Sequence, residues 1–370
     1  MEVPFVNLKA QYSTIKKEIL QAIEEVLEAN QFRGGKWVAK FEEAMSRFIG
    51  CGYAVGVGSG TDALVLALKA IGIREGDEVV TTPYSFIATA SSIVLAGGKP
   101  VFADIEPHTY TLSPQEAESK ITNKTKAIMP VHLFGQCADM QSFLNIAQKH
   151  SVKLIEDSAQ AIGASLNGIK AGNWGSASAF SFYPTKNLGA MGEGGMVTTN
   201  DPNIYEKLLL LRCHGSKVPY EHELIGYNSH LDTIQSAVLS IKLKYLENWN
   251  EERRKIAKYY TEKMKDLREI ITPVEREGSV CVYHQYVIRI KNRDEARKYL
   301  QEKGIGTAVF YPNPIHKQKA FNPYIEEKDR FPESEKLAQE SLALPIYPEL
   351  TTKQLDYVVN CIKDFLAKSH

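Results

Sequence analysis

The stretch YAVGVGSGTDALVLALKAI (residues 53–71) decides the fold class of this 370-residue chain. Its first five residues form a short apolar run, which predicts a buried strand over Tyr53–Val57. A turn of glycine and serine follows, and the apolar residues after it predict a helix over Thr61–Ile71. A strand that leads directly into a helix is the repeating unit of an α/β domain.

The same alternation continues toward the C-terminus. The further strands that we predict are Glu78–Thr82, Pro100–Ala103, Ala127–His132, Lys153–Glu156, Ala177–Phe182 and Gly195–Thr199. Helices are predicted between them at Ile87–Ala96 and Met140–His150. Because strands and helices alternate, we expect an α/β fold with a mostly parallel, seven-stranded sheet and helices on both faces.

The flanking segments predict the domain organisation. Two amphipathic helices, Ser13–Asn30 and Lys36–Ile49, precede the first strand. Asp232–Leu267 contains no proline or glycine, so we predict one long helix there that links two domains. A smaller α/β unit is predicted from Tyr283–Ile290, Asp294–Lys303, Gly306–Phe310 and the closing helix Thr351–Ala367. We therefore expect a large domain over 1–245 and a small C-terminal α/β domain over 246–370.

The composition is that of a globular protein, with 44% apolar and 24% charged residues. Lysine plus arginine equals aspartate plus glutamate at 44 each, so the chain lacks the basic excess that nucleic-acid binding requires. The five cysteines are scattered without zinc spacing, which predicts reduced thiols and no metal site. No apolar run approaches the roughly 18 residues of a membrane span, and the start MEVPFV lacks the character of a signal peptide. The expected location is therefore the cytoplasm.

Residues 56–61, GVGSGT, are the first candidate for ligand binding. They join a strand to a helix, so backbone N–H groups at the helix start can hold a phosphate. A dinucleotide fingerprint requires glycine or alanine where this chain has Thr61, and an acid at the end of the next strand, where it has none. This argues against a nicotinamide oxidoreductase. A plain tight turn between strand and helix is the alternative interpretation.

Two charged residues follow later strands. Asp157 ends an apolar strand, where a carboxylate can cap a helix or neutralise a cationic ligand atom. Lys186 lies between an apolar strand and a glycine-rich turn, and it is either solvated or a desolvated amine that forms a Schiff base. A phosphate cradle, a strand-end carboxylate and such a lysine are together what pyridoxal 5'-phosphate (PLP) needs.

Six motifs resemble the DegT/DnrJ family of sugar aminotransferases. They are GSGTDAL (58–64), HLFGQ (132–136), EDSAQ (156–160), SFYPTKNLG (181–189), GYNS (226–229) and YP (311–312). The resemblance runs in order from about residue 4 to the last helix. It implies a fold-type-I homodimer with shared active sites, PLP between a large and a small domain, and an amino-acid donor such as L-glutamate.

The resemblance also implies roles for particular residues. Lys186 would be the Schiff-base lysine and Asp157 the partner of the pyridine nitrogen. The other implied cofactor contacts are Phe86 on the ring face, Gln160 near the phenolic oxygen, Gly60, Thr61, the Asp62 backbone and Ser181 at the phosphate, and Asn228 from the partner subunit. The implied substrate contacts are Tyr183, His230, Tyr311 and His316.

The stretch NSHLD (228–232) bears on the sugar. Asn-Ser-x-Leu-Asp resembles the branch that aminates 3-keto sugars, whereas tyrosine after the asparagine resembles the 4-keto branch. Related sequences often carry arginine where this chain has His230, and arginine is the residue best shaped to bind a carboxylate. We therefore expect a neutral dTDP-linked 3-keto-6-deoxyhexose rather than a uronate. The argument fails if that arginine only braces Asp232, or if Arg33, Lys36 or Lys317 replaces it.

Several alternatives stay open from the sequence. The substrate could be a UDP-linked 3-keto uronate or a 4-keto sugar. A PLP-dependent sugar dehydratase with this fold lacks the lysine, so Lys186 argues against that reaction. A non-catalytic regulator with this fold usually carries a DNA-binding module, for which no residues are left over.

Overall fold

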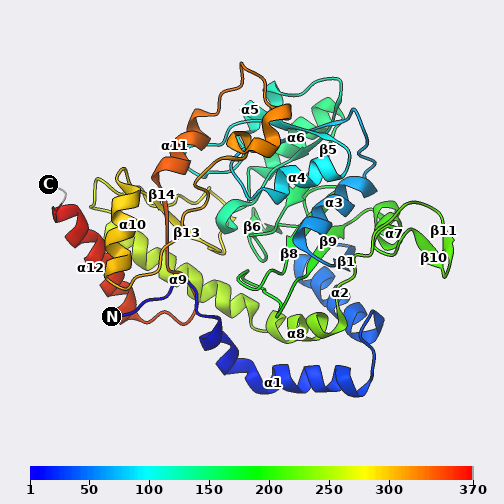
Figure 1. Cartoon of the computed structure of the whole chain (residues 1–370), viewed down its shortest axis with the longest axis horizontal. Coiled ribbons are helices and arrows are strands. Elements are labelled where there is room, and N and C mark those ends of the chain that lie inside the picture. The colour runs from blue at the N-terminus through cyan, green and yellow to red at the C-terminus, as the bar shows by residue number, and fades with distance from the viewer. Residues whose placement is uncertain (369–370) are drawn as a thin grey trace.

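A seven-stranded sheet forms the centre of the larger part of the molecule (Figure 1). The computed structural model describes residues 1–368, and the strand order is β1-β9-β8-β5-β4-β2-β3. The strands are β1 Tyr53–Val57, β2 Glu78–Thr81, β3 Lys99–Phe102, β4 Thr125–Met129, β5 Lys153–Asp157, β8 Ala177–Ser181 and β9 Gly195–Thr199. In this sheet β9 runs antiparallel to both its neighbours and the other pairs are parallel, so the predicted mostly parallel sheet is confirmed.

Helices cover both faces of the sheet. One face is covered by α3 (Gly60–Ala70), α4 (Ala88–Leu95) and α7 (Pro202–Leu211). The other face is covered by α2 (Gly35–Ile49), α5 (Pro114–Ser119) and α6 (Met140–His150). Successive strand residues point to opposite faces, which places Ile155 in the first core and Leu154 in the second.

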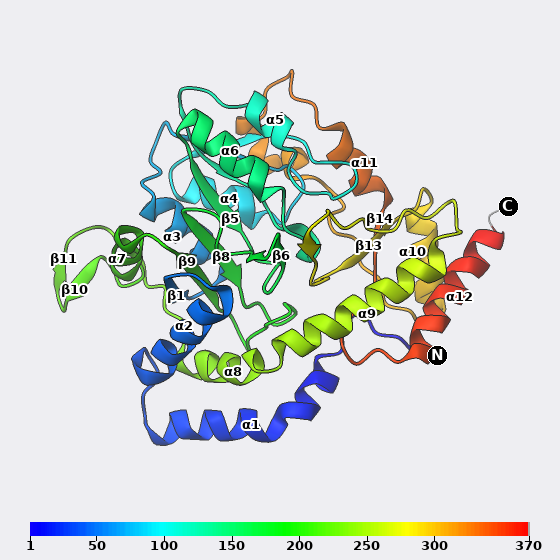
Figure 2. The same cartoon turned by 180° about the vertical axis from the view of Figure 1, so that it is seen from behind.

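The segment that we predicted as one long helix is two helices, α8 (Thr233–Leu243) and α9 (Leu246–Met264). The backbone N–H of Tyr245 bonds the carbonyl three residues back, which tightens and ends the first helix. The Tyr245 ring stacks on Trp249 with centroids 5.9 Å apart, and its hydroxyl contacts Glu18 of α1 (Leu8–Glu28). The break therefore comes from packing against α1, which lies along α8 (Figure 2), and not from a local helix breaker.

The C-terminal part is built on two antiparallel strands, β13 (Tyr286–Arg289) and β14 (Ser341–Leu344). The helices packed around them are α10 (Arg293–Glu302), α11 (Pro332–Glu340) and α12 (Thr352–Lys368). The predicted strand Gly306–Phe310 is wrong. Gly306 N bonds Val3 O, and Ala308 makes a single bridge with Ala343, so this segment is shared between two neighbours and forms no ladder.

The two parts share further contacts. Val3 is fully buried in the core of the C-terminal part, and the N-terminus lies beside α12 (Figure 1). The division at residue 245 stays a prediction. The remaining elements are β6 Ser165–Leu166, β7 Ile169–Lys170 and β12 Ser279–Val280, the projecting hairpin of β10 Ser216–Val218 and β11 Glu221–His222, and the 3-10 helices η1 Leu133–Gly135, η2 Ile315–Lys317 and η3 Lys319–Tyr324. Within residues 1–368, no helix has both the length and the apolar character needed to cross a membrane.

Candidate active site

A cavity of about 500 Å³ opens at the carboxyl ends of the parallel strands. Ligands bind at this edge in open α/β sheets, because loops from several strands meet there. The sequence-predicted residues that line it are Gly60, Thr61, Phe86, Asp157, Gln160, Ser181, Tyr183, Lys186 and Tyr311. Residues that are 251 positions apart in the sequence, from Gly60 to Tyr311, therefore face one space.

The start of α3 forms one wall of the cavity. Ser59 caps this helix by accepting a hydrogen bond from Asp62 N at 3.1 Å, and among the described residues no group accepts from the N–H of Gly60 or Thr61. A Cβ on Gly60 would lie 2.6 Å from Ser181 Cβ, so glycine lets β8 approach the helix start. Two free N–H groups and the Ser181 hydroxyl thus lie together, as an anion site requires.

Asp62 lies in the first turn of the same helix, and the resemblance implied a phosphate contact for its backbone. Its N–H is used by Ser59, and its carboxylate accepts from Ser229 Oγ at 2.8 Å, outside the cavity. A phosphate contact from Asp62 stays a prediction.

Asp157 ends β5 and is almost fully buried beside the cavity. Its Oδ2 accepts a hydrogen bond from Thr89 Oγ1 at 2.7 Å and its Oδ1 accepts one from Ala159 N at 3.2 Å. Burial raises the pKa of this carboxyl, against the effect of the Thr89 hydrogen bond. The chain after Asp157 makes turns, so the helix-cap interpretation has no helix to cap.

Lys186 comes from the loop between β8 and β9 and points into the same cavity. Within residues 1–368, Nζ makes no hydrogen bond or ion pair with any side chain or carbonyl. Burial lowers the pKa of Lys186 to about 8, and the charge of Asp157 opposes that shift. The lysine is thus a partly desolvated amine with its donors free, and not a solvated surface cation.

Helices α8 and α9 hold the lysine loop from behind. Lys242 Nζ donates to Gly189 O at 2.6 Å, and Asn187 Nδ2 donates to Asn250 Oδ1 at 2.8 Å. Asn187 Nδ2 also donates to Val282 O at 2.8 Å, so the loop is tied to the segment before β13. The position of the amine is therefore set by parts of the chain about 60 to 95 residues further on.

His284 lines the cavity from that same segment, and no pattern in the sequence indicated it. Its side chain is buried, and burial together with the charges of Lys186 and Arg253 lowers the pKa of the imidazole well below its usual value. The ring is thus neutral. The other polar cavity residues for which the sequence predicted no role are Ser59, Ser85, Thr89, Thr185, Glu193 and Gln285. Ser85 and Thr89 flank Phe86 in sequence, and that proximity is the one signal that could have found them.

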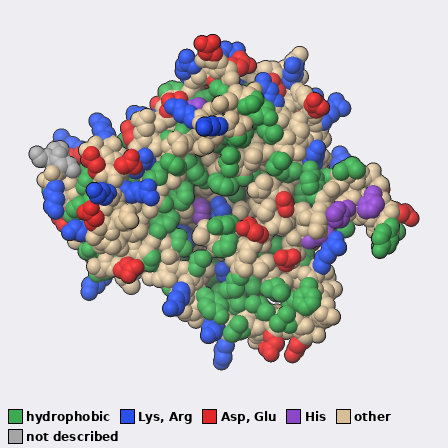
Figure 3. Space-filling model, in the orientation of Figure 1, with side chains coloured by type: hydrophobic (Ala, Val, Ile, Leu, Met, Phe, Trp, Pro, Cys, Tyr) green, Lys and Arg blue, Asp and Glu red, His purple; other side chains and the backbone are tan. Residues whose placement is uncertain are grey.

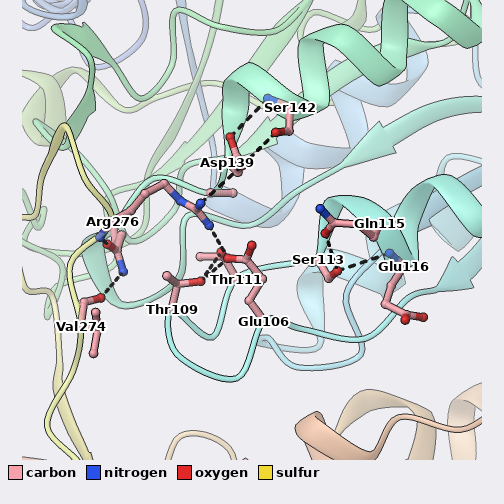
Figure 4. Close-up of polar contacts among 12 residues, drawn as sticks. Glu106, Thr109, Thr111, Ser113, Gln115, Glu116, Asp139, Ser142, Val274 and Arg276 are labelled. Atoms are coloured by element: carbon pink, nitrogen blue, oxygen red, sulfur yellow. Dashed lines mark hydrogen bonds and ion pairs between the residues drawn. The ribbon is translucent and has the colours of Figure 1, made fainter.

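Arg276 anchors the chain that leads to His284 (Figure 4). Its guanidinium contacts Glu106 and lies 3.3 Å from Asp139 Oδ2. Its backbone N donates to Gln136 Oε1 at 2.6 Å. These contacts fix the segment to the large sheet part, on the side of β4 and α6.

Aromatic and amide side chains complete the cavity. The Phe86 ring is 57% exposed and lies 6.4 Å from the Tyr311 ring, so one of its faces is free toward the cavity. Gln160 donates from Nε2 to the Tyr311 hydroxyl at 2.9 Å and accepts from Phe134 N at 2.7 Å. Its orientation is thus set by two partners.

Besides Asp62, three predicted residues lie outside this cavity. Asn228 is exposed and pairs through its backbone with Cys213. His230 Nε2 contacts the Arg33 guanidinium, and burial together with that charge lowers the pKa of His230 to about 4. His316 bonds Glu335 at 3.1 Å and packs on Phe331, away from the cavity. The structure does not bring these side chains to the amine of Lys186 in one protomer.

A desolvated amine and a buried strand-end carboxylate that line one cavity suit imine chemistry on a carbonyl compound. More closely, the chain belongs to the DegT/DnrJ/EryC1/StrS aminotransferase family, which matches residues 13–363. The resemblance found in the sequence is thereby confirmed, and so is the assignment of the chain as a sugar aminotransferase.

Similar proteins cover nearly the whole chain. A protein of Geobacillus stearothermophilus named "Pleiotropic regulatory protein" is 47% identical over 99% of both chains. The dTDP-3-amino-3,6-dideoxy-alpha-D-galactopyranose transaminase of Aneurinibacillus thermoaerophilus is 42% identical over 98% of this chain and 99% of its own. The UDP-2-acetamido-2-deoxy-3-oxo-D-glucuronate aminotransferase of Pseudomonas aeruginosa is 38% identical over 96% and 98%.

Solved structures have the same fold. DesV of S. venezuelae superposes with a TM-score of 0.96 at 39% identity over 98% of each chain. NtdA of Bacillus subtilis, solved with bound cofactor PMP, superposes with a TM-score of 0.92 at 30% identity over 99% of this chain and 85% of its own. The predicted fold of a PLP aminotransferase is confirmed by these neighbours.

Proposed function

We propose that this protein transfers an amino group from L-glutamate to carbon 3 of a nucleotide-linked keto-sugar, with PLP bound covalently at Lys186. The observation that supports it most is the free, desolvated amine of Lys186 in a cavity that also contains Asp157 and the start of α3. A non-catalytic regulator would not need such an amine, although one relative is named a regulatory protein.

The residues of the cavity fit this cofactor. The N–H groups of Gly60 and Thr61 and the Ser181 hydroxyl would hold its phosphate, and the free face of Phe86 would lie against its ring. When bound, PLP supplies an electron sink for the carbon that gains or loses the amine. Asp157 would hold a proton at the ring nitrogen. Lys186, with its pKa near 8, can take up and release a proton near neutral pH.

The first test is a half-reaction. Enzyme loaded with PLP is mixed with L-glutamate without sugar, and the release of 2-oxoglutarate is measured. One equivalent per site is expected, followed by amination of a keto-sugar when it is added. Absence of the matching 2-oxo acid with each of glutamate, glutamine, aspartate and alanine would contradict the proposed function.

We propose dTDP-linked 3-keto-6-deoxyhexoses as the sugar substrates. The 42% identical relative is named for such a dTDP sugar, and His230 offers no fixed charge for a sugar carboxylate. A second candidate is a UDP-linked 3-keto uronate, because Arg33 contacts His230 and carries the cation that His230 lacks. A 4-keto sugar is the less supported substrate, since Ser229 and not tyrosine follows Asn228.

The two sugars are separated by comparing kcat/KM for each in the wild type and in Arg33→Gln. A preference of at least a hundredfold for the 6-deoxy sugar, about 2.7 kcal/mol, is expected. If the wild type prefers the uronate, and Arg33→Gln lowers kcat/KM for the uronate but not for the 6-deoxy sugar, the uronate is the substrate. Arg33 would then bind the sugar carboxylate in place of the arginine that this chain lacks at position 230.

We propose a homodimer whose two subunits share each active site. The exposed side chain of Asn228 is free to reach a second copy, and apolar side chains gather over α1 (Figure 3), including Leu20, Leu27 and, just beyond the helix, Phe32. Mixed dimers of Asn228→Ala and Lys186→Ala should regain activity, because one hybrid site has both intact residues. No recovery in dimers shown to be mixed would contradict sharing of the active sites.

We also propose a cytoplasmic location, which the free thiols of all five cysteines support.

A further inference from the structure

We propose that Thr89 is a positioning residue that orients the carboxylate of Asp157 through a hydroxyl relay beginning at Ser85. This inference rests on the proposed function, because it concerns the residue that would face the ring nitrogen of PLP. It assigns a role to two buried hydroxyls that no motif of the sequence singled out.

The relay is short and shielded from solvent. Thr89 Oγ1 lies 2.7 Å from Asp157 Oδ2, and Ser85 Oγ lies 2.8 Å from Thr89 Oγ1. All three residues are less than 5% exposed. Each distance is within the range of a strong O–H···O hydrogen bond.

The direction of the relay follows from proton counting. An ionised carboxylate can only accept, so the single hydroxyl proton of Thr89 is donated to Asp157. Thr89 then has no proton left for Ser85, and Ser85 must donate to Thr89. The relay therefore favours the charged form of Asp157, the form that can hold a proton at the ring nitrogen.

The same stretch of chain forms two sides of the ring site. Ser85 and Thr89 are four residues apart at the start of α4, with Phe86 between them facing the cavity. The stretch is fixed by Tyr84, whose hydroxyl donates to Phe310 O at 2.6 Å and accepts from Tyr311 N at 2.8 Å. The ring face of Phe86 and the carboxylate of Asp157 are thus set by one rigid segment.

The charge of Asp157 depends on every group that faces it. Lys186 comes from the lysine loop, His132 follows β4 and Tyr311 comes from the C-terminal part. The positive charge of Lys186 favours ionised Asp157, whereas burial opposes it. Covalent attachment of Lys186 to PLP changes its charge, and the Thr89 hydroxyl stays in place. Its donor is then, together with the N–H of Ala159, the constant support of the carboxylate.

The test uses four variants, Thr89→Val, Thr89→Ser, Ser85→Ala and Ser92→Ala, in the PLP-loaded enzyme and in the cofactor-free protein. Thr89→Val keeps the shape of the side chain and removes the donor, and Thr89→Ser keeps the donor. Ser92→Ala is the matched control, because Ser92 is a buried hydroxyl on the same helix that bonds Thr89 O and not Asp157. The measurements are kcat, KM for the sugar, the pH profile of kcat, and PLP affinity from the absorbance of the cofactor.

Thr89→Val is expected to lower kcat about ten- to a hundredfold with KM changed less than about threefold, and to weaken PLP binding about two- to fivefold. Loss of the donor raises the pKa of Asp157, so the acid limb of the kcat profile should move to higher pH. Thr89→Ser and Ser92→Ala should resemble the wild type. Ser85→Ala should shift the limb in the same direction by less.

Wild-type kcat, acid limb and PLP affinity in Thr89→Val would overturn the proposal. So would Thr89→Ser behaving like Thr89→Val, because the methyl group and not the donor would then matter. These outcomes are distinct from failure of the proposed function. In that case the wild type itself releases no 2-oxoglutarate from glutamate, whatever residue stands at 89.

Discussion

The last two residues of β5, Glu156 and Asp157, are neighbouring buried carboxylates on opposite faces of one sheet, and they differ in how fully they are bonded. Glu156 accepts four hydrogen bonds at 2.8–2.9 Å, from the backbone N–H groups of Gly172, Trp174 and Gly175 and from His132 Nε2. Asp157 accepts two, and it borders the cavity. Glu156 therefore holds the loop 172–175 in place, whereas Asp157 is available to a ligand.

The difference follows from strand geometry. Side chains alternate along a strand, so a one-residue step moves a carboxylate from the face covered by α6 to the face covered by α4. On the first face the loop 172–175 turns its N–H groups toward Glu156. On the second face β5 ends at the edge of the sheet where the cavity opens. Two acids with the same burial thus have opposite expected roles, and substitutions can test both.

The largest effect is expected at the amine that faces Asp157. Lys186→Ala should lower kcat by more than about 10⁴-fold, because it removes both the attachment point of PLP and the group that moves protons. The absorbance of covalently bound PLP should be lost together with activity. Activity near the wild-type rate in this variant would contradict the assignment of Lys186.

Asp157→Asn should lower kcat by about 10²–10³-fold, because an amide can contact the ring nitrogen but cannot stabilise its protonated form. PLP affinity should change less than about tenfold. Urea unfolding of the cofactor-free variant should show no loss of stability, since a poorly bonded buried carboxylate is costly. Unchanged kcat would mean that Asp157 serves only the turn at Ala159.

Glu156→Gln should show the reverse pattern. An amide oxygen cannot replace four charge-assisted bonds, and its NH₂ group would face the N–H donors of the loop. The free energy of unfolding should fall by about 2–4 kcal/mol, with kcat of the folded enzyme within about threefold of wild type. If kcat fell as far as in Asp157→Asn while stability held, the contrast between the two acids would be wrong.

The sequence was sufficient to predict those site residues that stand at or shortly after the end of a strand. Both Asp157 and Lys186 follow apolar strands of a parallel sheet, so their presence in one cavity could be expected from topology. The strands of the large sheet could be predicted because glycine or polar residues flank each apolar run. Phe86, Gln160 and Tyr311 lie in the same cavity, as the family resemblance implied.

Other features depend on contacts between distant segments, which a single sequence does not encode locally. The break at Tyr245 has no proline or glycine, and it exists because α1 packs there. Thr89 and His284 lie within a predicted helix and a predicted strand without any motif around them, and only the fold turns them toward the cavity. The resemblance implied a substrate contact for His316, but its ring packs on Phe331, away from the cavity.

The smallest expected effect concerns Lys186 in the cofactor-free protein and its dependence on pH. The ordinary pKa of a lysine is 10.5, and burial lowers the pKa of Lys186 to about 8 in the folded state. Between these values the unfolded chain binds more protons than the folded chain, so the free energy of unfolding rises with pH in that window. Well below pH 8 the amine is charged in both states and contributes almost no slope.

Relative to Lys186→Met, the wild type should therefore gain stability between about pH 8 and pH 10 in urea unfolding, with no relative change between pH 6 and pH 7.5. Lys242 has a pKa lowered to about 8 by burial as well, so Lys242→Met serves as the control and should remove a slope of its own. Parallel curves for wild type and Lys186→Met would show that the Lys186 amine is as solvated as a surface lysine. The pairing of a free amine with the under-bonded Asp157 would then lose its physical basis, while the four-bonded Glu156 would be unaffected.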